Sequence, residues 1–400
     1  MKILLATFFV IPHLGGIWNY MQQLRKELTS LGHEVDLLGS GENQDFIYIF
    51  NKNEKYIGDI NILNSEKNKS VTTTDFFVKR YQTLIQFYES SLRKLDINQY
   101  DLIHTQDVFS AGIVNKVRPQ KTALVASLHG SVAHELKHFH IKKSPTSELA
   151  YKYFDQIEYE GASSAEYTIV ANEWLKNKLI LEYKAPGKNI KILPYGYDIE
   201  NFFNKLNGQS PISDPTGRKV IIFMGRLVEL KGVHFLISSL QMLKQTRKDW
   251  VCWIVGDGVK FTSLQKQVND LKLNNEVIFW GSRKDVPSLL SKSDIFVLPS
   301  LFENQPLSVI EAQLSGKAVI VSDAGGLPEM IKHRSTGIIT KAGNPQHLTS
   351  AINELLENES FRKDLGQNAK KWAMTFWSQE KAIKKLIKIY DQAISERKKA

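Results

Sequence analysis

Two basic residues follow an apolar run in the second half of the chain. The run Val220–Met224 is typical of a buried strand, and Gly225, Arg226, Lys231 and Gly232 come after it. Arginine offers a planar pair of donors to a phosphate, lysine offers a point charge, and the start of a helix adds unpaired amide N–H groups. This loop could therefore bind a diphosphate, although two solvated cations on a surface loop would give the same pattern.

Two glutamates eight residues apart, Glu303 and Glu311, form a second candidate site. Pro306 suits the first turn of a helix, so we expect Glu303 in the preceding loop and Glu311 inside the helix. A fully helical segment would separate the carboxylates by about 12 Å, beyond the roughly 5 to 9.5 Å between cooperating glycosidase carboxylates. The spacing favours two carboxylates that hold different parts of one extended ligand. A charge at a helix N-terminus plus a surface glutamate is the plainer alternative.

Three histidines in the first half of the chain are further candidates. His129 follows the apolar run 123–128, and a single histidine at such a place is more often structural than catalytic. His134 and His138 are four residues apart, as zinc ligands on a helix can be. The remaining ligands of a catalytic zinc site are not evident in the sequence, so we expect no metal site.

The elements that must position these residues alternate between apolar runs and amphipathic stretches. Strands are expected at 2–10, 34–38, 102–104, 123–128, 168–170 and 191–193, and then at 220–224, 251–255, 277–280, 295–298 and 318–321. Such alternation predicts two doubly wound α/β domains in tandem, each with a parallel sheet. Ligands of these sheets bind at the carboxyl ends of the strands, where the candidate residues stand.

Residues 207–217 are rich in Asn, Gly, Pro, Asp and Ser and so mark a linker. We place the boundary there, between an N-terminal domain of residues 1–205 and a C-terminal domain of residues 206–377. A last helix, at about 378–400, carries an apolar stripe and basic residues largely elsewhere on its surface. We expect it to pack back on the N-terminal domain with a solvated basic face. A helix lying on a membrane surface is the alternative.

Composition narrows the class of protein. The chain has 400 residues, 42% hydrophobic and 24% charged, which is the balance of a globular protein and excludes disorder, fibres and coiled coils. The single cysteine, Cys252, cannot form an internal disulfide and favours a reducing compartment. The apolar start lacks a small-x-small cleavage site, so a buried strand is preferred to a signal peptide. The net charge of +10 favours an anionic partner: nucleic acid, a membrane surface or a phosphorylated substrate.

Taken together, the motifs resemble those of the retaining glycosyltransferases of family four. That family has the GT-B fold, two tandem Rossmann-like domains facing a cleft. The resemblance covers nearly the whole chain and is strongest from Val220 to Gly337. It is carried by Gly15-Gly16, Gly32-His33-Glu34-Val35, His129-Gly130, Gly225-Arg226, Lys231-Gly232, Gly256-Asp257-Gly258, the segment Glu303–Glu311, and Gly325-Gly326-Leu327-Pro328-Glu329.

The resemblance implies roles for the charged candidates. Arg226 and Lys231 would bind the diphosphate of a nucleotide sugar and stabilise its charge as it leaves. Glu311 would hold the ribose hydroxyls, and Glu303 would be a catalytic residue beside the reacting carbon of the donor sugar. His129 matches the family's active-site histidine, also beside the donor sugar.

The resemblance also implies roles for backbone groups. Gly16 would let the N-terminal loop approach the donor phosphates and, with Gly15, the acceptor, because glycine has no Cβ. Arg283 matches a position whose backbone contacts the base.

The chain departs from the family pattern after the first glutamate, where it has Asn304, Gln305 and Pro306 instead of glycines. Pro306 has no N–H group, so phosphate donors here would have to be Asn304, Gln305 or Leu307. Tyr195 also stands where the family commonly has asparagine. These departures leave the identity of the donor sugar open.

The resemblance implies a cytoplasmic, metal-independent hexosyltransferase that retains configuration, with a nucleotide sugar as co-substrate and no cofactor. A UDP-sugar is the favoured donor, and the acceptor would be a glycan, a lipid-linked sugar or a small molecule. Polysaccharide biosynthesis is an expectation for the family, and nucleic acid is not expected as a partner. Peripheral association with the inner face of the membrane is a hypothesis that rests on the basic, aromatic-bearing segment 134–143. The rivals are a nucleotide-sugar epimerase on the same fold and a non-catalytic protein that binds polyanions or membrane surfaces.

Overall fold

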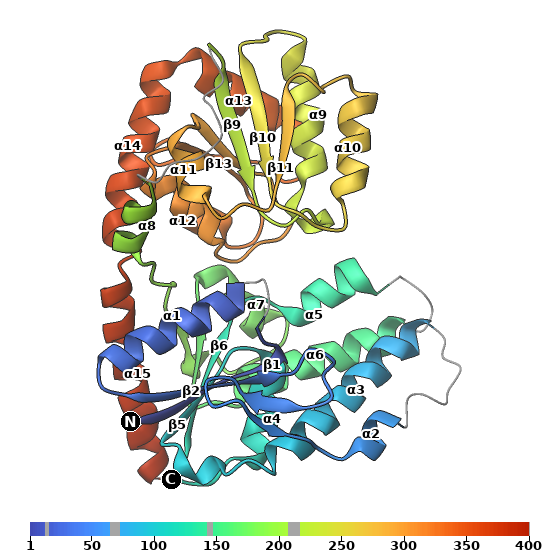
Figure 1. Ribbon diagram of the computed structural model, residues 1–400, viewed down its shortest axis with the longest axis vertical. Helices are drawn as coiled ribbons and strands as arrows, with labels where there is room; N and C mark the ends of the chain where they lie inside the picture. Colours follow the sequence, from blue (N-terminus) through green and yellow to red (C-terminus); the bar gives the residue numbers. More distant parts are fainter. Residues whose placement is uncertain (13–15, 65–72, 142–146, 207–216, 400) are drawn as a thin grey trace. The chain divides into compact units, whose positions relative to one another are not determined.

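The computed structural model describes residues 1–12, 16–64, 73–141, 147–206 and 217–399 (Figure 1). The contacts divide the chain into two compact units, one of residues Met1–Leu193 with those from Ile383 onward, the other of residues Pro194–Ala382. The contact boundary before Pro194 lies one helix earlier than the boundary placed from the sequence, because Phe202 of that helix, α8 (Ile199–Leu206), packs in the core of the second unit. Of the predicted linker 207–217, residues 207–216 lie outside the described residues.

The first unit is built on an eight-stranded sheet in the order β4-β3-β2-β1-β5-β6-β7-β8. Its strands are β1 (Lys2–Val10), β2 (Glu34–Ser40), β3 (Ile47–Ile49), β4 (Glu54–Tyr56), β5 (Leu102–Thr105), β6 (Ala123–Leu128), β7 (Tyr167–Val170) and β8 (Ile190–Ile192). All neighbours pair in parallel except β2 with β3 and β3 with β4.

Strand β1 shows why its sequence is apolar at nearly every position. Leu4 and Ala6 pack in one core, whereas Ile3 and Leu5 pack in another. Successive side chains of a strand point to opposite faces, so both faces of this sheet are covered. The covering helices are α1 (Gly16–Ser30), α3 (Thr73–Leu92), α4 (Val108–Val117), α5 (Val132–Glu135), α6 (Ser147–Ser163) and α7 (Glu173–Leu181), with a π-helical turn at Leu136–His140. The short helix α2 (Ile60–Asn64) has no buried residue and contacts α3.

The last helix, α15 (Gln379–Lys399), contributes Ile383, Leu386 and Tyr390 to the first unit's core. Lys381, Lys384, Lys385 and Lys388 are exposed on the remaining surface of this helix. The apolar stripe is thus covered by protein. Among the described helices, none is both long enough and apolar enough to cross a membrane.

The second unit has a six-stranded, wholly parallel sheet in the order β11-β10-β9-β12-β13-β14. Its strands are β9 (Lys219–Met224), β10 (Trp250–Val255), β11 (Val277–Gly281), β12 (Ile295–Leu298), β13 (Ala318–Ser322) and β14 (Ile338–Thr340). Its helices besides α8 are α9 (Val233–Lys244), α10 (Phe261–Asp270), α11 (Val286–Ser291), α12 (Leu307–Leu314), α13 (Pro345–Glu357) and α14 (Glu359–Phe376). One continuous core fills this unit.

The observed strands follow the sequence prediction closely. Strands β1, β6 and β12 have the predicted bounds, β8 is shifted by one residue, and the other predicted strands differ by one or two residues at one end. The sequence analysis missed β3, β4 and β14, each of three residues. A strand this short gives no alternation that can be recognised, and β4 has no buried residue.

Candidate functional site

The loops that follow strands β9, β10 and β11 are joined to one another by backbone hydrogen bonds. Gly225 N donates to Val255 O at 3.0 Å, Leu227 N to Asp257 O at 2.8 Å, and Gly256 N to Gly281 O at 2.8 Å. The chain Gly256-Asp257-Gly258 therefore lies directly against the loop that carries Arg226. These contacts build one continuous surface at the carboxyl edge of the second unit's sheet.

Lys231 and Glu303 meet at this edge. Strand β9 lies beside β12, and Leu301 N in the loop after β12 donates to Leu230 O at 2.7 Å. Gly232 has a φ of 65°, and a Cβ atom there would lie 2.1 Å from Pro299 O, so the two loops can approach this closely only with glycine. Lys231 Nζ forms an ion pair with Glu303 Oε2, and each side chain is 15% exposed. Sequence analysis named both residues but did not foresee that they pair.

The backbone of Glu303 is fixed by the glycine pair of a later motif. Gly326 N donates to Glu303 O at 3.0 Å. Gly325 has a φ of 62°, and a Cβ there would lie 1.9 Å from the same oxygen. Two glycines more than twenty residues along the chain thereby determine where Glu303 stands.

Glu311 lies inside α12, as predicted, whereas Pro306 occupies the N-cap of that helix and not its first turn. The hydroxyl of Tyr197 donates to Glu311 Oε1 at 2.7 Å. Burial raises the pKa of the Glu311 carboxyl to about 7, and the hydrogen bond from Tyr197 opposes that rise. Burial and the neighbouring carboxylate raise the pKa of Tyr197 in turn. Glu311 is therefore a carboxyl group poised to change charge near neutral pH.

The segment between the two glutamates is mostly inaccessible. Asn304 and Gln305 are 5% and 6% exposed. Gln305 Oε1 accepts from Tyr195 N at 3.2 Å, while its Nε2 has no hydrogen-bond partner in the described part of the chain. Leu307 begins α12, where the first-turn N–H groups have no partner within the helix.

The two arginines differ in how free their side chains are. Arg226 is exposed and forms no ion pair with any residue that the structure describes. Arg283 donates from Nε and Nη2 to the two carboxylate oxygens of Asp285 at 2.8 and 2.7 Å. The guanidinium of Arg226 is thus available to an anion, and that of Arg283 is engaged within its own loop.

The first unit holds His129 and Gly16. His129 follows β6; its Nε2 lies 3.0 Å from Gln106 Oε1 and its ring centroid 5.0 Å from that of Tyr20. Burial lowers the pKa of His129 to about 4, so the imidazole is neutral at physiological pH. Gly16 is exposed at the start of α1, and a Cβ there would meet no atom of the described residues within 4 Å. Gly15 lies outside the described residues.

The histidine pair in the first unit is arranged for stacking. The ring centroids of His134 and His138 are 4.0 Å apart, and His138 Nδ1 lies 3.0 Å from His134 O. Across the ranges the structure describes, no group of three or more His, Cys, Asp or Glu residues could hold a metal ion.

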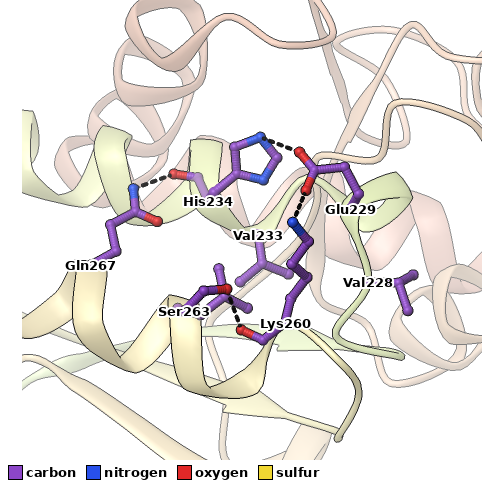
Figure 2. A pocket seen from close by; sticks show the side chains of 8 residues that line it. Val228, Glu229, Val233, His234, Lys260, Ser263 and Gln267 are labelled. Carbon is purple, nitrogen blue, oxygen red and sulfur yellow. Dashed lines mark hydrogen bonds and ion pairs between the residues drawn. The ribbon is translucent and has the colours of Figure 1, made fainter. Parts of the chain in front are cut away.

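A small cavity of about 180 Å³ lies beside α9 and α10 in the second unit (Figure 2). Glu229 bridges two basic groups on its wall, with Lys260 Nζ at 2.6 Å and His234 Nε2 at 3.5 Å. Sequence analysis did not name these residues, because no sequence pattern brings Glu229 to Lys260. Glu229 lies two residues before Lys231, so the cavity borders the same loop.

Two Rossmann-like units in tandem, each built on a sheet rich in parallel strands, are the architecture of the GT-B fold. The Anabaena protein HepE in complex with UDP-glucose superposes with a TM-score of 0.71 at 22% identity, covering 98% of this chain and 100% of that chain. This likeness confirms the predicted fold.

Sequence comparison identifies the family. The model described as "Glycosyltransferase Family 4" matches residues 14–201, and that described as "Glycosyl transferases group 1" matches residues 209–372. An uncharacterized glycosyltransferase of Methanocaldococcus jannaschii is 25% identical over 404 residues, covering 98% of this chain and 99% of that protein. The N,N'-diacetylbacillosaminyl-diphospho-undecaprenol alpha-1,3-N-acetylgalactosaminyltransferase of Campylobacter jejuni is 30% identical over 252 residues, covering 62% and 63%. The chain belongs to glycosyltransferase family 4.

Proposed function

We propose that the protein transfers a hexose from a UDP-sugar to a lipid-linked or glycan acceptor, with retention of configuration and without a metal ion. The observation that carries this proposal is the partly buried Lys231–Glu303 pair at the carboxyl edge of the second unit. The cation can stabilise the negative charge that develops on the departing diphosphate. The neighbouring carboxylate can act next to the reacting carbon of the sugar. The bound UDP-glucose of HepE and the diphospho-undecaprenol acceptor named for the Campylobacter enzyme support the choice of donor and acceptor.

Each proposed role follows from where the side chain stands. Lys231 Nζ and the exposed guanidinium of Arg226 would bind the diphosphate and stabilise the negative charge that grows on its oxygens as the glycosidic bond breaks. Glu303, held by Gly325 and Gly326, would contact the donor sugar next to the reacting carbon. Glu311 would accept hydrogen bonds from the ribose hydroxyls.

The remaining proposed roles belong to backbone groups and to the first unit. N–H groups at Asn304, Gln305 and Leu307 would complete the phosphate contacts, and the backbone near Arg283 would contact the base. His129 would lie beside the donor sugar, and Gly16 would approach the phosphates and the acceptor. The nucleotide sugar is then a co-substrate, and no cofactor takes part.

The test is a calorimetric binding panel with UDP-, GDP- and ADP-sugars, run with and without EDTA. Selective binding of a UDP-sugar that EDTA leaves unchanged is the expected result, and no binding of any nucleotide sugar would overturn the proposal. Product analysis with the bound donor then separates transfer from epimerisation, because an epimerase changes the sugar without an acceptor. The anomeric configuration of the product decides between retention and inversion.

We also propose a cytoplasmic location with peripheral attachment to an anionic membrane surface. The exposed lysines of α15 support it, since a basic surface is attracted to anionic lipid by about 1 kcal/mol per residue near the membrane. The apolar stripe of α15 is covered, so attachment would be electrostatic. The protein should sediment with anionic vesicles at low salt. Absence of the protein from the vesicle pellet under these conditions would contradict the proposal.

A further inference from the structure

A buried glutamine lies in α12, the helix of the second unit that carries Glu311. The buried side chains of α12 are Val309, Ile310, Ala312, Gln313 and Leu314. Gln313 is the polar side chain of this set, and it is 0% exposed. Burying an amide in an apolar core costs free energy unless its groups are hydrogen-bonded. The position of Gln313 is therefore explained only by the partners that its amide finds there.

Both ends of the Gln313 amide are hydrogen-bonded. Nε2 donates to Met330 O at 2.8 Å, and Oε1 accepts from Trp377 Nε1 at 2.9 Å. A carbonyl can only accept and an indole N–H can only donate, so these partners determine which end of the amide is nitrogen. Trp377 is 2% exposed and directly follows α14, which packs against α12 (Figure 1). Gln313 therefore cannot turn over without leaving two buried groups unpaired.

The carbonyl that Gln313 binds belongs to the turn that also holds Glu303. Met330 is the last residue of a short 3-10 helix, Leu327–Met330. Gly326, directly before this helix, donates from its N–H group to Glu303 O. The segment from Glu303 to Gln313 is thus hydrogen-bonded at both of its ends to the same turn, residues 326–330.

These two attachments limit how the segment can move. Without the attachment at Gln313, α12 could slide or rotate while Glu303 stays where Gly326 holds it. Glu311 lies two positions before Gln313 in the same short helix, so its carboxylate would move with that end. Two groups that hold one extended ligand must keep their spacing, and a misplacement of about 1 Å can cost a large part of the effect.

We propose that Gln313 is a positioning residue that fixes the spacing of Glu303 and Glu311, so that both carboxylates reach one nucleotide sugar. This inference rests on the proposed function, because it takes the sugar and the ribose of the donor to be the ligand groups of the two glutamates. Gln313 is fully buried and acts through Glu311.

The first test is a double-mutant cycle on donor affinity, measured by calorimetry with the UDP-sugar that the panel identifies. Gln313→Met removes both hydrogen-bonding groups and keeps an unbranched side chain of similar size, so it should weaken donor binding by about tenfold. In a Glu311→Ala background the same change should weaken binding by less than about twofold, because the group that Gln313 positions is already absent. Equal losses in both backgrounds would overturn the proposal, since a general loss of structure does not depend on Glu311.

The second test restores the two hydrogen bonds through pH. In Gln313→Glu, a protonated carboxyl has an O–H for Met330 O and an oxygen for Trp377 Nε1, whereas an ionised carboxylate has no proton to donate. The ratio of variant to wild-type donor affinity should therefore be near one at about pH 5.5 and fall towards about one tenth as this carboxyl ionises at higher pH. A ratio that stays at about one tenth at the acid end as well would overturn the proposal, because the hydrogen bonds would be restored without restoring binding.

Trp377→Phe provides the measurement if the changes at Gln313 prevent folding. It removes the indole N–H and leaves the contact of Gln313 with Met330 in place, so donor binding should weaken by a smaller factor, about threefold. This loss should again disappear in the Glu311→Ala background. A loss of the same size in both backgrounds would contradict the proposal.

The matched control is Arg362→Met. Arg362 is 5% exposed in α14 and donates to a backbone carbonyl, Leu355 O, at 2.5 Å, but its partner Asp294 precedes β12 and so lies at the opposite edge of the sheet. This variant should lower stability in urea and leave donor affinity unchanged. If wild type binds no nucleotide sugar, the proposed function fails and this inference with it. If wild type binds and Gln313→Met binds equally well, this inference alone fails.

Discussion

The carboxyl edges of the two sheets are built from opposite kinds of side chain. In the second unit the edge carries charge: Lys231 is paired with Glu303, and Arg226 is exposed. In the first unit the candidate residue at this edge is the neutral imidazole of His129, held between Gln106 and Tyr20. The same fold thus provides a surface suited to a diphosphate in one unit and a surface suited to hydroxyl groups in the other.

The comparison extends to a pair of glutamates, one from each unit, whose carboxyl pKa is raised by burial. Burial raises the pKa of both Glu311 and Glu158 to about 7. Glu158 Oε2 accepts from Ala133 N at 3.0 Å, so it fixes the start of α5, and its other oxygen has no partner among the described residues. Glu311 lies instead at the proposed ribose contact. Ionisation of Glu158 should therefore affect the stability of the first unit, whereas ionisation of Glu311 should affect ligand binding.

The largest effect is expected from removing the cation at the charged edge. Lys231→Ala should weaken nucleotide-sugar binding by about 10- to 100-fold, because a charge-assisted hydrogen bond to phosphate is lost. The measurement is calorimetric titration with the donor that the panel identifies. An unchanged affinity would show that Lys231 does not bind the diphosphate, and the charged edge of the second unit would then have no special role in donor binding.

The second unit offers a matched control for this variant. Lys244, at the end of α9, pairs with Glu276 at 2.9 Å just before β11, with the two side chains 25% and 11% exposed. It is a similar ion pair at the opposite edge of the same sheet. Lys244→Ala should lower stability in urea about as much as Lys231→Ala does, and should leave the affinity unchanged. A stability loss without an affinity loss in both variants would assign Lys231 a structural role.

The Lys231–Glu303 pair also shows where sequence reasoning ends. Both residues could be named from their motifs, but 72 positions separate them. Their meeting depends on β9 lying between β10 and β12, a strand order that no local pattern records. Gln106 was missed for a related reason. A single glutamine after a strand carries no periodicity, and its contacts with His104 O and His129 Nε2 come from the order of the strands. Buried strands, by contrast, were predicted well because their apolar runs are themselves the signal.

A smaller effect is expected from pH. Glu311 must be ionised to accept ribose hydroxyls at full strength, and its pKa of about 7 means that it is mostly protonated at pH 6. Affinity for the nucleotide sugar should rise about tenfold from pH 6 to pH 8. The nucleotide sugar is the right probe, because its diphosphate has no terminal phosphate that titrates in this range. Stability of the free protein should change in the opposite direction. A raised pKa in the folded state favours the protonated form, so stability is lost as pH rises from about 4.5 to about 7.

Three variants sharpen the pH experiment. Glu311→Gln should bind weakly and without this pH dependence. Tyr197→Phe removes a hydrogen bond that lowers the pKa of Glu311, so the midpoint of the affinity profile should move to higher pH. Glu158→Gln should change the pH dependence of stability and leave that of affinity intact. Equal pH profiles of affinity in wild type and Glu311→Gln would show that Glu311 does not touch the ligand.

The smallest expected effect concerns Gly16 at the neutral edge. A Cβ at this position would meet no atom within 4 Å in the part of the chain that the structure describes, so Gly16→Ala should leave stability unchanged or slightly higher. Any loss of activity must then come from contact between the new methyl group and a ligand, and we expect roughly a fivefold rise in KM, equivalent to about 1 kcal/mol.

Gly112 in α4 supplies the comparison for Gly16. A Cβ there also meets nothing within 4 Å among the described residues, and Gly112 lies within the helix, so Gly112→Ala should stabilise the protein by about 0.5–1 kcal/mol without changing KM. Steady-state kinetics with varied donor and varied acceptor show which substrate approaches Gly16, because only the KM of that substrate should rise. If the KM values of Gly16→Ala for both substrates equal those of wild type, neither substrate lies close enough to Gly16 to contact a methyl group there. His129 would then be the remaining candidate for a ligand contact in the first unit.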